Sequence, residues 1–97
     1  MFRSAGSKDI DIVHELLVAE ARLGRFDQRL AQEPYSAALR KNLNHIRRKG
    51  RRLDEDLAAQ LLVWEADGAV AGFVVTSAIV PGAGNEILML AVVPEFR

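Results

Sequence analysis

The sequence predicts a fold of the broad α/β class, with an α+β arrangement in which two helices pack on one mixed sheet. Residues 1–97 are expected to form a single domain. The hydrophobic pattern has a helical period as far as Gly50 and a strand-like pattern from Leu61 onward. An Asp-Gly turn separates two apolar strands in the second half. Apolar residues make up 49% and charged residues 27% of the 97 residues, which is the composition of a single globular domain.

The first half begins with a strand and a helix. Residues 2–5 predict a short strand, which Gly6 closes. Ser7 or Asp9 then offers an N-terminal cap for a helix that ends near Gly24. The apolar residues of this helix recur at helical spacing: Ile10, Val13, Leu16, Leu17 and Ala21.

A second helix follows. Pro34 can open it, because the first turn of a helix does not use the N–H group that proline lacks. Gly50 ends the pattern, and residues 53–60 fit either a helical turn or a loop. The apolar face of the second helix consists of Leu39, Leu43 and Ile46.

The second half predicts an antiparallel meander of three strands. Residues 61–66 and 69–77 form two strands joined at Asp67-Gly68, which is a strong hairpin signal. A turn over residues 81–85 leads to the last strand, residues 86–93. No internal repeat and no low-complexity linker interrupts this order.

The last strand presents an edge that the chain does not cover. Residues 87–93 are apolar on both faces, as in a strand in the middle of a covered sheet. Only residues 94–97 remain to pair with its second side. We therefore expect either that the chain is the front part of a longer fold or that a partner completes the sheet, most simply as a homo-oligomer.

The charges balance in number but not in position. Thirteen basic and thirteen acidic residues cancel, yet seven of the basic residues lie between Arg40 and Arg52, and residues 34–53 contain no acid. The run Arg47–Arg52 is typical of a solvated helix end. It could also bind phosphates, but the balanced charge and the absence of interleaved aromatic residues lead us not to expect a nucleic-acid partner.

Several classes of site and location are excluded or not expected. The chain has no cysteine, which rules out disulfides, thiolate metal sites and a cysteine nucleophile. His14 and His45 stand 31 residues apart without carboxylates at ligand spacing, so we expect no metal site. The start has no apolar signal region, and the longest apolar run is far shorter than a membrane helix. We expect a cytoplasmic protein with no membrane partner.

The last twelve residues, Glu-Ile-Leu-Met-Leu-Ala-Val-Val-Pro-Glu-Phe-Arg, carry a family resemblance. They resemble the fourth strand of the GCN5-related N-acetyltransferase (GNAT) superfamily, with Val92, Pro94, Phe96 and Arg97 matching its V-x-P-x-(Phe/Tyr)-Arg pattern. The upstream order of one strand, two helices and a hairpin also agrees. The resemblance covers essentially the whole chain but only the first half of that fold, so we expect a GNAT-like domain truncated after the fourth strand, before the family's glycine-rich pyrophosphate loop.

The resemblance implies an N-acetyltransferase that uses acetyl-CoA as co-substrate and transfers acetyl directly to a primary amine of a small molecule or peptide. It implies that backbone groups of Leu90, Ala91 and Val92 bind the pantetheine arm and that Arg97 contacts the pyrophosphate. It also implies that Glu86, the sole charged residue from Gly68 to Pro94, acts as the base. For this chain alone we expect weak or absent catalysis.

Other interpretations of these residues remain open. Glu86 could be a solvated carboxylate at the start of a strand, residues 90–92 a plain core strand, and Arg97 a frayed end. A non-catalytic module that oligomerises or binds a partner through the open edge of residues 87–93 is the alternative function.

Overall fold

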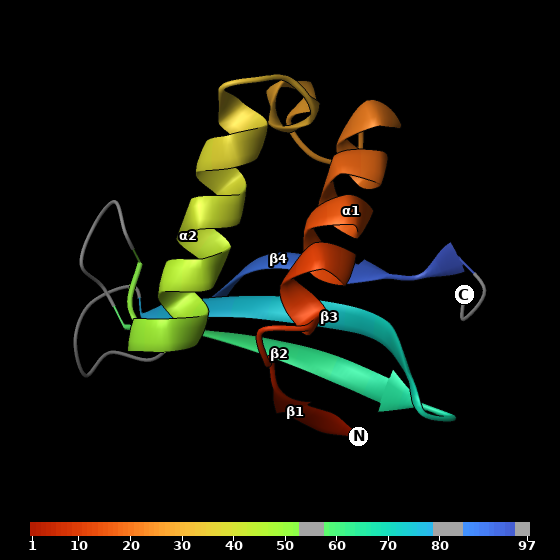
Figure 1. Ribbon diagram of the computed structural model, residues 1–97, viewed down its shortest axis with the longest axis vertical. Helices are drawn as coiled ribbons and strands as arrows, with labels where there is room; N and C mark the ends of the chain where they lie inside the picture. The colour runs from red at the N-terminus through yellow and green to blue at the C-terminus, as the bar shows by residue number, and fades with distance from the viewer. Residues whose placement is uncertain (53–57, 79–84, 95–97) are drawn as a thin grey trace.

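One sheet and two long helices account for most of the described residues, 1–52, 58–78 and 85–94, of this computed structural model (Figure 1). A short 3-10 helix lies between the two long helices. In chain order the elements are β1 (Phe2–Ser4), α1 (Asp9–Arg22), η1 (Gln28–Ala31), α2 (Tyr35–Lys49), β2 (Ala59–Ala66), β3 (Ala69–Ala78) and β4 (Asn85–Val92).

The four strands follow one another across the sheet in the order β1-β2-β3-β4, and every neighbouring pair is antiparallel. The β2–β3 hairpin turns at Asp67 and Gly68, whose φ angles of 52° and 77° are those of the tight turn that the sequence predicts. The predicted α+β architecture is confirmed, but the expectation of a mixed sheet is wrong, because all four strands that the structure describes pair antiparallel.

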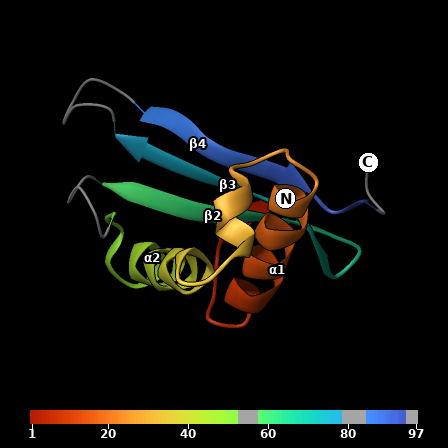
Figure 2. The same cartoon turned by 90° about the horizontal axis from the view of Figure 1, so that it is seen from above.

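Both long helices cover the same face of the sheet (Figure 2). The apolar residues that the sequence predicts for their inner faces are buried there against the alternating inward residues of β2 and β3. Within the described residues no helix covers the opposite face. The main contributors to the core are Ile10, Val13, Leu17, Leu39, Leu43, Ile46, Val63, Phe73 and Val75.

The start of α1 differs from the prediction. Lys8 precedes the helix, and no side chain caps it. Asp9 is the first helical residue, and its carboxylate accepts hydrogen bonds from the Gly6 N–H, at 2.7 Å, and from Arg3. Neither Ser7 nor Asp9 is therefore the N-cap, because Arg3 and the preceding turn engage the carboxylate instead.

The other helix ends follow local signals. Gly50, with a φ of 66°, ends α2 in the left-handed conformation that glycine adopts without strain. The sequence pattern did not predict η1, which Asp27 caps by accepting a hydrogen bond from the Arg29 N–H.

The segment between α2 and the hairpin joins the sheet earlier than expected. Ala59 begins β2, and its N–H donates to the Gly50 carbonyl at 2.9 Å. The first part of the stretch left open between a helical turn and a loop, residues 53–57, lies outside the described residues, as do residues 81–84 of the predicted turn.

Candidate functional site

The outer edge of β4 is the feature that the sequence singles out, and hydrogen bonding orients its backbone. The Val93 N–H donates to the Ala71 carbonyl across to β3 at 2.7 Å. In an antiparallel pair, residues that exchange hydrogen bonds alternate with residues whose N–H and C=O point away from the partner strand. In this register Ala91, opposite Phe73, faces β3, and Leu90 directs its N–H and C=O toward the outer edge. Of the three residues expected to offer backbone groups, Leu90 and Val92 therefore have the suitable orientation, and the backbone of Ala91 does not.

Two hollows flank this edge, and both are lined by residues 90–92. One, of about 310 Å³, lies on the face of the sheet that no described helix covers, beside Phe2, Trp64 and Gly72. The other, of about 360 Å³, lies toward the C-terminal end of α1, beside Glu20, Arg25 and Phe26. An extended ligand lying along β4 would have space on both sides of the strand.

The first hollow owes its shape to a glycine between large apolar side chains. Trp64, Gly72 and Val92 stand side by side on neighbouring strands, and Phe2 packs edge-on against Trp64 with ring centroids 5.0 Å apart. A Cβ atom at Gly72 would lie 2.7 Å from the Ala91 carbonyl oxygen. Only glycine therefore lets β3 approach β4 this closely, and the missing side chain leaves the hollow open.

The second hollow contains an ion pair whose carboxylate is buried. The Glu20 side chain is 5% exposed, and its carboxylate accepts a hydrogen bond from Arg25 at 2.9 Å. The Arg25 side chain is 54% exposed, so its guanidinium reaches from the buried carboxylate toward the surface. The side of the edge nearest α1 is thus charged, and the opposite side is apolar.

Two of the expected site residues are described only in part or not at all. Glu86 lies in β4 opposite Ser77, but its side chain is outside the described part of the structure. Arg97 lies outside the described residues. The roles implied for both by the resemblance stay predictions.

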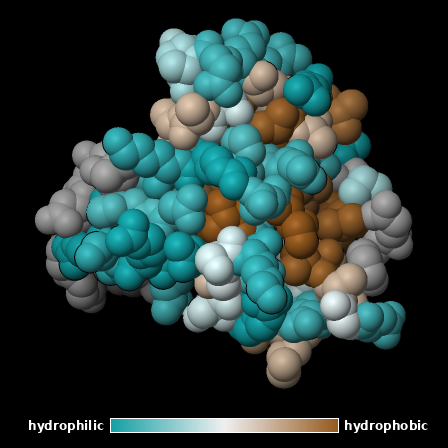
Figure 3. Space-filling model, in the orientation of Figure 1, coloured by the Kyte–Doolittle hydropathy of each residue, from teal (hydrophilic) through white to brown (hydrophobic). Residues whose placement is uncertain are grey.

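Figure 3 shows how apolar surface is distributed on the helix-bearing face. Hydrophobic atoms reach the surface between α1 and α2 and beside α1, and hydrophilic atoms cover the lower part of α2. A hollow of about 500 Å³ lies between α2 and the sheet, lined mainly by core side chains such as Leu43, Val75 and Met89. This hollow adjoins the core, and the described residues that line it include no arrangement of acid, base or nucleophile that suggests chemistry.

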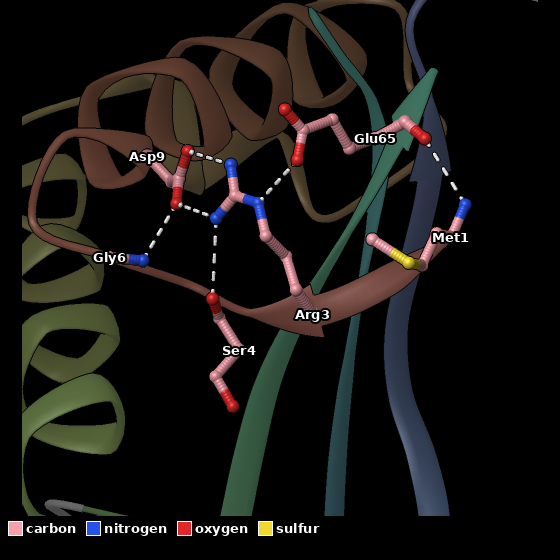
Figure 4. A network of polar contacts seen from close by, with 6 residues as sticks. All are labelled: Met1, Arg3, Ser4, Gly6, Asp9 and Glu65. Atoms are coloured by element: carbon pink, nitrogen blue, oxygen red, sulfur yellow. Dashed lines mark hydrogen bonds and ion pairs between the residues drawn. The ribbon is translucent and has the colours of Figure 1, made fainter. Parts of the chain in front are cut away.

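A polar network ties β1, β2 and α1 together (Figure 4). Arg3 donates to the Asp9 carboxylate through both terminal nitrogens, at 2.7 and 3.1 Å, and to Glu65 through Nε at 2.8 Å. Hydrogen bonds from Arg3 and from the Gly6 N–H hold the pKa of Asp9 below its ordinary value, although burial of the carboxylate opposes this shift. All of these contacts join the chain's own elements, so the network is structural.

Sequence reasoning did not find this network. The sequence offers Ser7 or Asp9 as a helix cap and does not specify a pairing partner for the first strand. The available signal is Arg3 in the middle of the first strand together with Glu65 in another strand. This signal becomes informative only when the register of β1 against β2 is known.

In the part of the chain that the structure describes, neither the histidines nor the potential metal ligands form a second site. His14 lies close to the carbonyl and hydroxyl oxygens of Ser36, at 3.0 and 3.1 Å, and so links α1 to the start of α2. No group of three or more potential metal-binding side chains occurs among the residues that the structure describes. No helix in the described ranges has the length and apolar character needed to cross a membrane.

Comparison with known proteins adds no assignment: no family model matches the chain, and neither a curated protein nor a solved structure is significantly similar to it.

Proposed function

We propose that the chain belongs to an acetyl-CoA-dependent N-acetyltransferase of the GNAT kind, in which the outer edge of β4 binds the pantetheine arm of acetyl-CoA. The observation that carries the proposal is the outward-facing backbone of Leu90 between two hollows. Pantetheine is an extended chain with two amide groups, and such a chain can pair with a strand edge through backbone hydrogen bonds. The apolar hollow beside Trp64 would take its hydrocarbon parts.

The reaction would be a direct transfer. The nitrogen of a primary amine, on a small molecule or peptide, attacks the thioester carbonyl carbon; the C–N bond forms, the C–S bond breaks, and the thiolate of CoA leaves and takes up a proton. Before the attack the ammonium group must lose a proton, and Glu86 is the proposed base. Glu20 and Arg25 line the hollow on the α1 side, where charged groups of the acceptor would meet them.

A calorimetric titration of the 97-residue chain with acetyl-CoA tests the cofactor site. We expect saturable binding that Leu90→Pro abolishes, because proline removes the N–H that faces the edge but costs no hydrogen bond to β3. Leu90→Ala is the matched control, since it trims the side chain and keeps the N–H. Circular dichroism of both variants checks that the sheet is retained.

Two results would contradict the proposal. A folded wild-type chain that produces no heat with acetyl-CoA would show that the edge is not a cofactor site. Equal binding by the Leu90→Pro and Leu90→Ala variants would show that acetyl-CoA binds somewhere other than the outward-facing backbone.

A second candidate function is a pairing module that joins β4 to the β4 of a second copy. The observation in its favour is the exposure of Leu90, at 56%, together with Phe2, Trp64 and Val92 on the same uncovered face. Sedimentation analysis separates the two candidates: pairing predicts a dimer whose stability is indifferent to acetyl-CoA and is reduced by Leu90→Pro.

A further inference from the structure

The two long helices carry opposite charge. Helix α1 has four acidic residues and one arginine, whereas α2 has five basic residues and no acid. The balanced total of thirteen basic and thirteen acidic residues therefore conceals a strongly basic side of the molecule. A partner approaching from the side of α2 meets a positive potential despite the zero net charge.

Much of this positive charge is not neutralised within the described structure. Arg40 pairs with Asp11 of α1. The Nε and Nη2 atoms of Arg47 lie 3.4 Å from the Asn44 side-chain oxygen, a neutral acceptor. Among the described residues, no carboxylate forms an ion pair with Lys41, Arg48 or Lys49.

Five side chains of α2 line one hollow of about 440 Å³, which we call the α2 basic surface: Lys41, Asn44, His45, Arg47 and Arg48. Lys41, His45 and Arg48 share one face of the helix, since they are spaced by four and three residues. The residues described as lining this hollow offer N–H donors from lysine, arginine, histidine and asparagine, and none of them is an acid.

The length of this surface suits a polyanion. At a rise of about 1.5 Å per residue, the cations from Lys41 to Arg48 extend over about 10 Å. One strand of a nucleic-acid duplex presents a phosphate about every 3.4 Å along the axis, so about three to four successive phosphates would lie within reach.

We propose that the α2 basic surface binds the phosphate backbone of a nucleic-acid duplex without reading its sequence. Lysine and arginine on a helix supply the charge-assisted hydrogen bonds that phosphates accept. This inference does not depend on the acetyltransferase proposal, because α2 contributes no residue to either hollow at the β4 edge.

The surroundings favour a duplex over other anionic partners. A single strand gains affinity by stacking its bases on aromatic rings, but Phe2 and Trp64 lie on the opposite face of the sheet, and Tyr35 lies at the other end of α2. A membrane-bound helix inserts an apolar face, and the apolar residues of α2, such as Leu43 and Ile46, are buried in the core.

Fluorescence anisotropy with a labelled DNA duplex of about 20 base pairs and arbitrary sequence tests this proposal on the 97-residue chain. For about four phosphate contacts, we expect the affinity to fall roughly 100-fold between about 50 and 200 mM salt. Lys41→Gln/Arg48→Gln should weaken binding at least about 10-fold at the lower salt concentration and reduce the salt slope by about two. An unrelated duplex sequence should bind equally well, because the contacts are to phosphates.

Lys8→Gln/Arg22→Gln is the matched control, since it removes the same charge beside the two ends of α1 and should leave most of the affinity. All four positions are exposed, and glutamine favours helix, so both variants are expected to fold. The proposal is overturned if no duplex binds at low salt or if both variants lose affinity equally. It is also overturned if polyglutamate or anionic lipid vesicles bind as tightly as the duplex.

Discussion

The carboxylate of Asp9 shows how one residue can hold three segments together. It accepts hydrogen bonds from the Gly6 N–H and from two nitrogens of Arg3, and Arg3 in turn reaches Glu65 on the neighbouring strand (Figure 4). The Asp9 side chain is only 8% exposed, so its charge depends on these partners rather than on water. Replacing a buried carboxylate that accepts several hydrogen bonds lowers the stability of the fold, because the donors left behind lose their acceptor.

Asp9→Asn should lower the free energy of unfolding by about 2 kcal/mol, because Arg3 would lose a charged acceptor next to the core. Urea denaturation measures the change. Asp27→Asn is a suitable control: Asp27 also pairs with an arginine, but its site is more exposed, and asparagine caps a helix as well as aspartate does. If Asp27→Asn lowered the free energy of unfolding as much as Asp9→Asn does, burial of the Asp9 carboxylate would not explain its contribution.

The same carboxylate predicts a pH dependence. The pKa of Asp9 is lower in the folded chain than its ordinary value of 3.8, so its contribution to stability is complete above that value and is lost as the pH falls below it. Between about pH 4 and the folded-state pKa, the difference in stability between wild type and Asp9→Asn should therefore shrink. A difference that stays constant on acidification would show that the Asp9 carboxylate is not stabilised by folding.

At the scale of elements, the β3–β4 pair determines the geometry of the candidate site. The close approach at Gly72 brings Ala91 and Val92 against β3 and leaves a gap between Trp64 and Val92. The register of the same pair turns the backbone of Leu90 outward. A single glycine thus affects both the spacing of the strands and the space beside them.

Gly72→Ala should destabilise the protein by about 1–3 kcal/mol, since the new methyl group would lie 2.7 Å from the Ala91 carbonyl oxygen and must push β4 away. It should also weaken any ligand that binds along the edge. Gly6→Ala is the control, because the nearest atom to its added methyl group lies at 3.6 Å. Thermal denaturation of the two variants measures the difference in their stability. Equal stability of Gly72→Ala and Gly6→Ala would argue against the close approach of β3 to β4 at Gly72.

At the scale of the whole molecule, two surfaces lie apart from each other. The hollow beside β4 on the uncovered face of the sheet is lined mainly by apolar residues. Helix α2, which lies on the opposite face (Figure 2), carries the α2 basic surface. Ligands of different chemistry could therefore bind at the same time.

Trp64 is the chain's one tryptophan, is 43% exposed and lines the apolar hollow, so its fluorescence reports on that face. Acetyl-CoA binding along β4 should shift its emission to shorter wavelength, because the ligand removes water from the ring. Pairing with a second copy would instead make the emission depend on protein concentration. Emission that responds to neither change would count against both candidate functions.

Much of the fold could be predicted because its signals are local. The apolar stripes of both helices, the left-handed glycine after α2 and the Asp-Gly hairpin all depend on residues close together in the sequence. The 3-10 helix at Gln28–Ala31 escaped prediction, since four residues are too few to show a periodic pattern. The start of α1 was misjudged because Asp9 has a partner, Arg3, on another element.

The sequence by itself determined the order of the elements, their inner faces and the apolar character of the last strand, because periodicity and turn residues act over short distances. The tertiary structure alone decided that both helices share one face, that Leu90 rather than Ala91 faces the edge, and that Gly72 opens a hollow there. These features depend on strand order and register, which bring together residues far apart in the chain and which a shift of one residue would reverse.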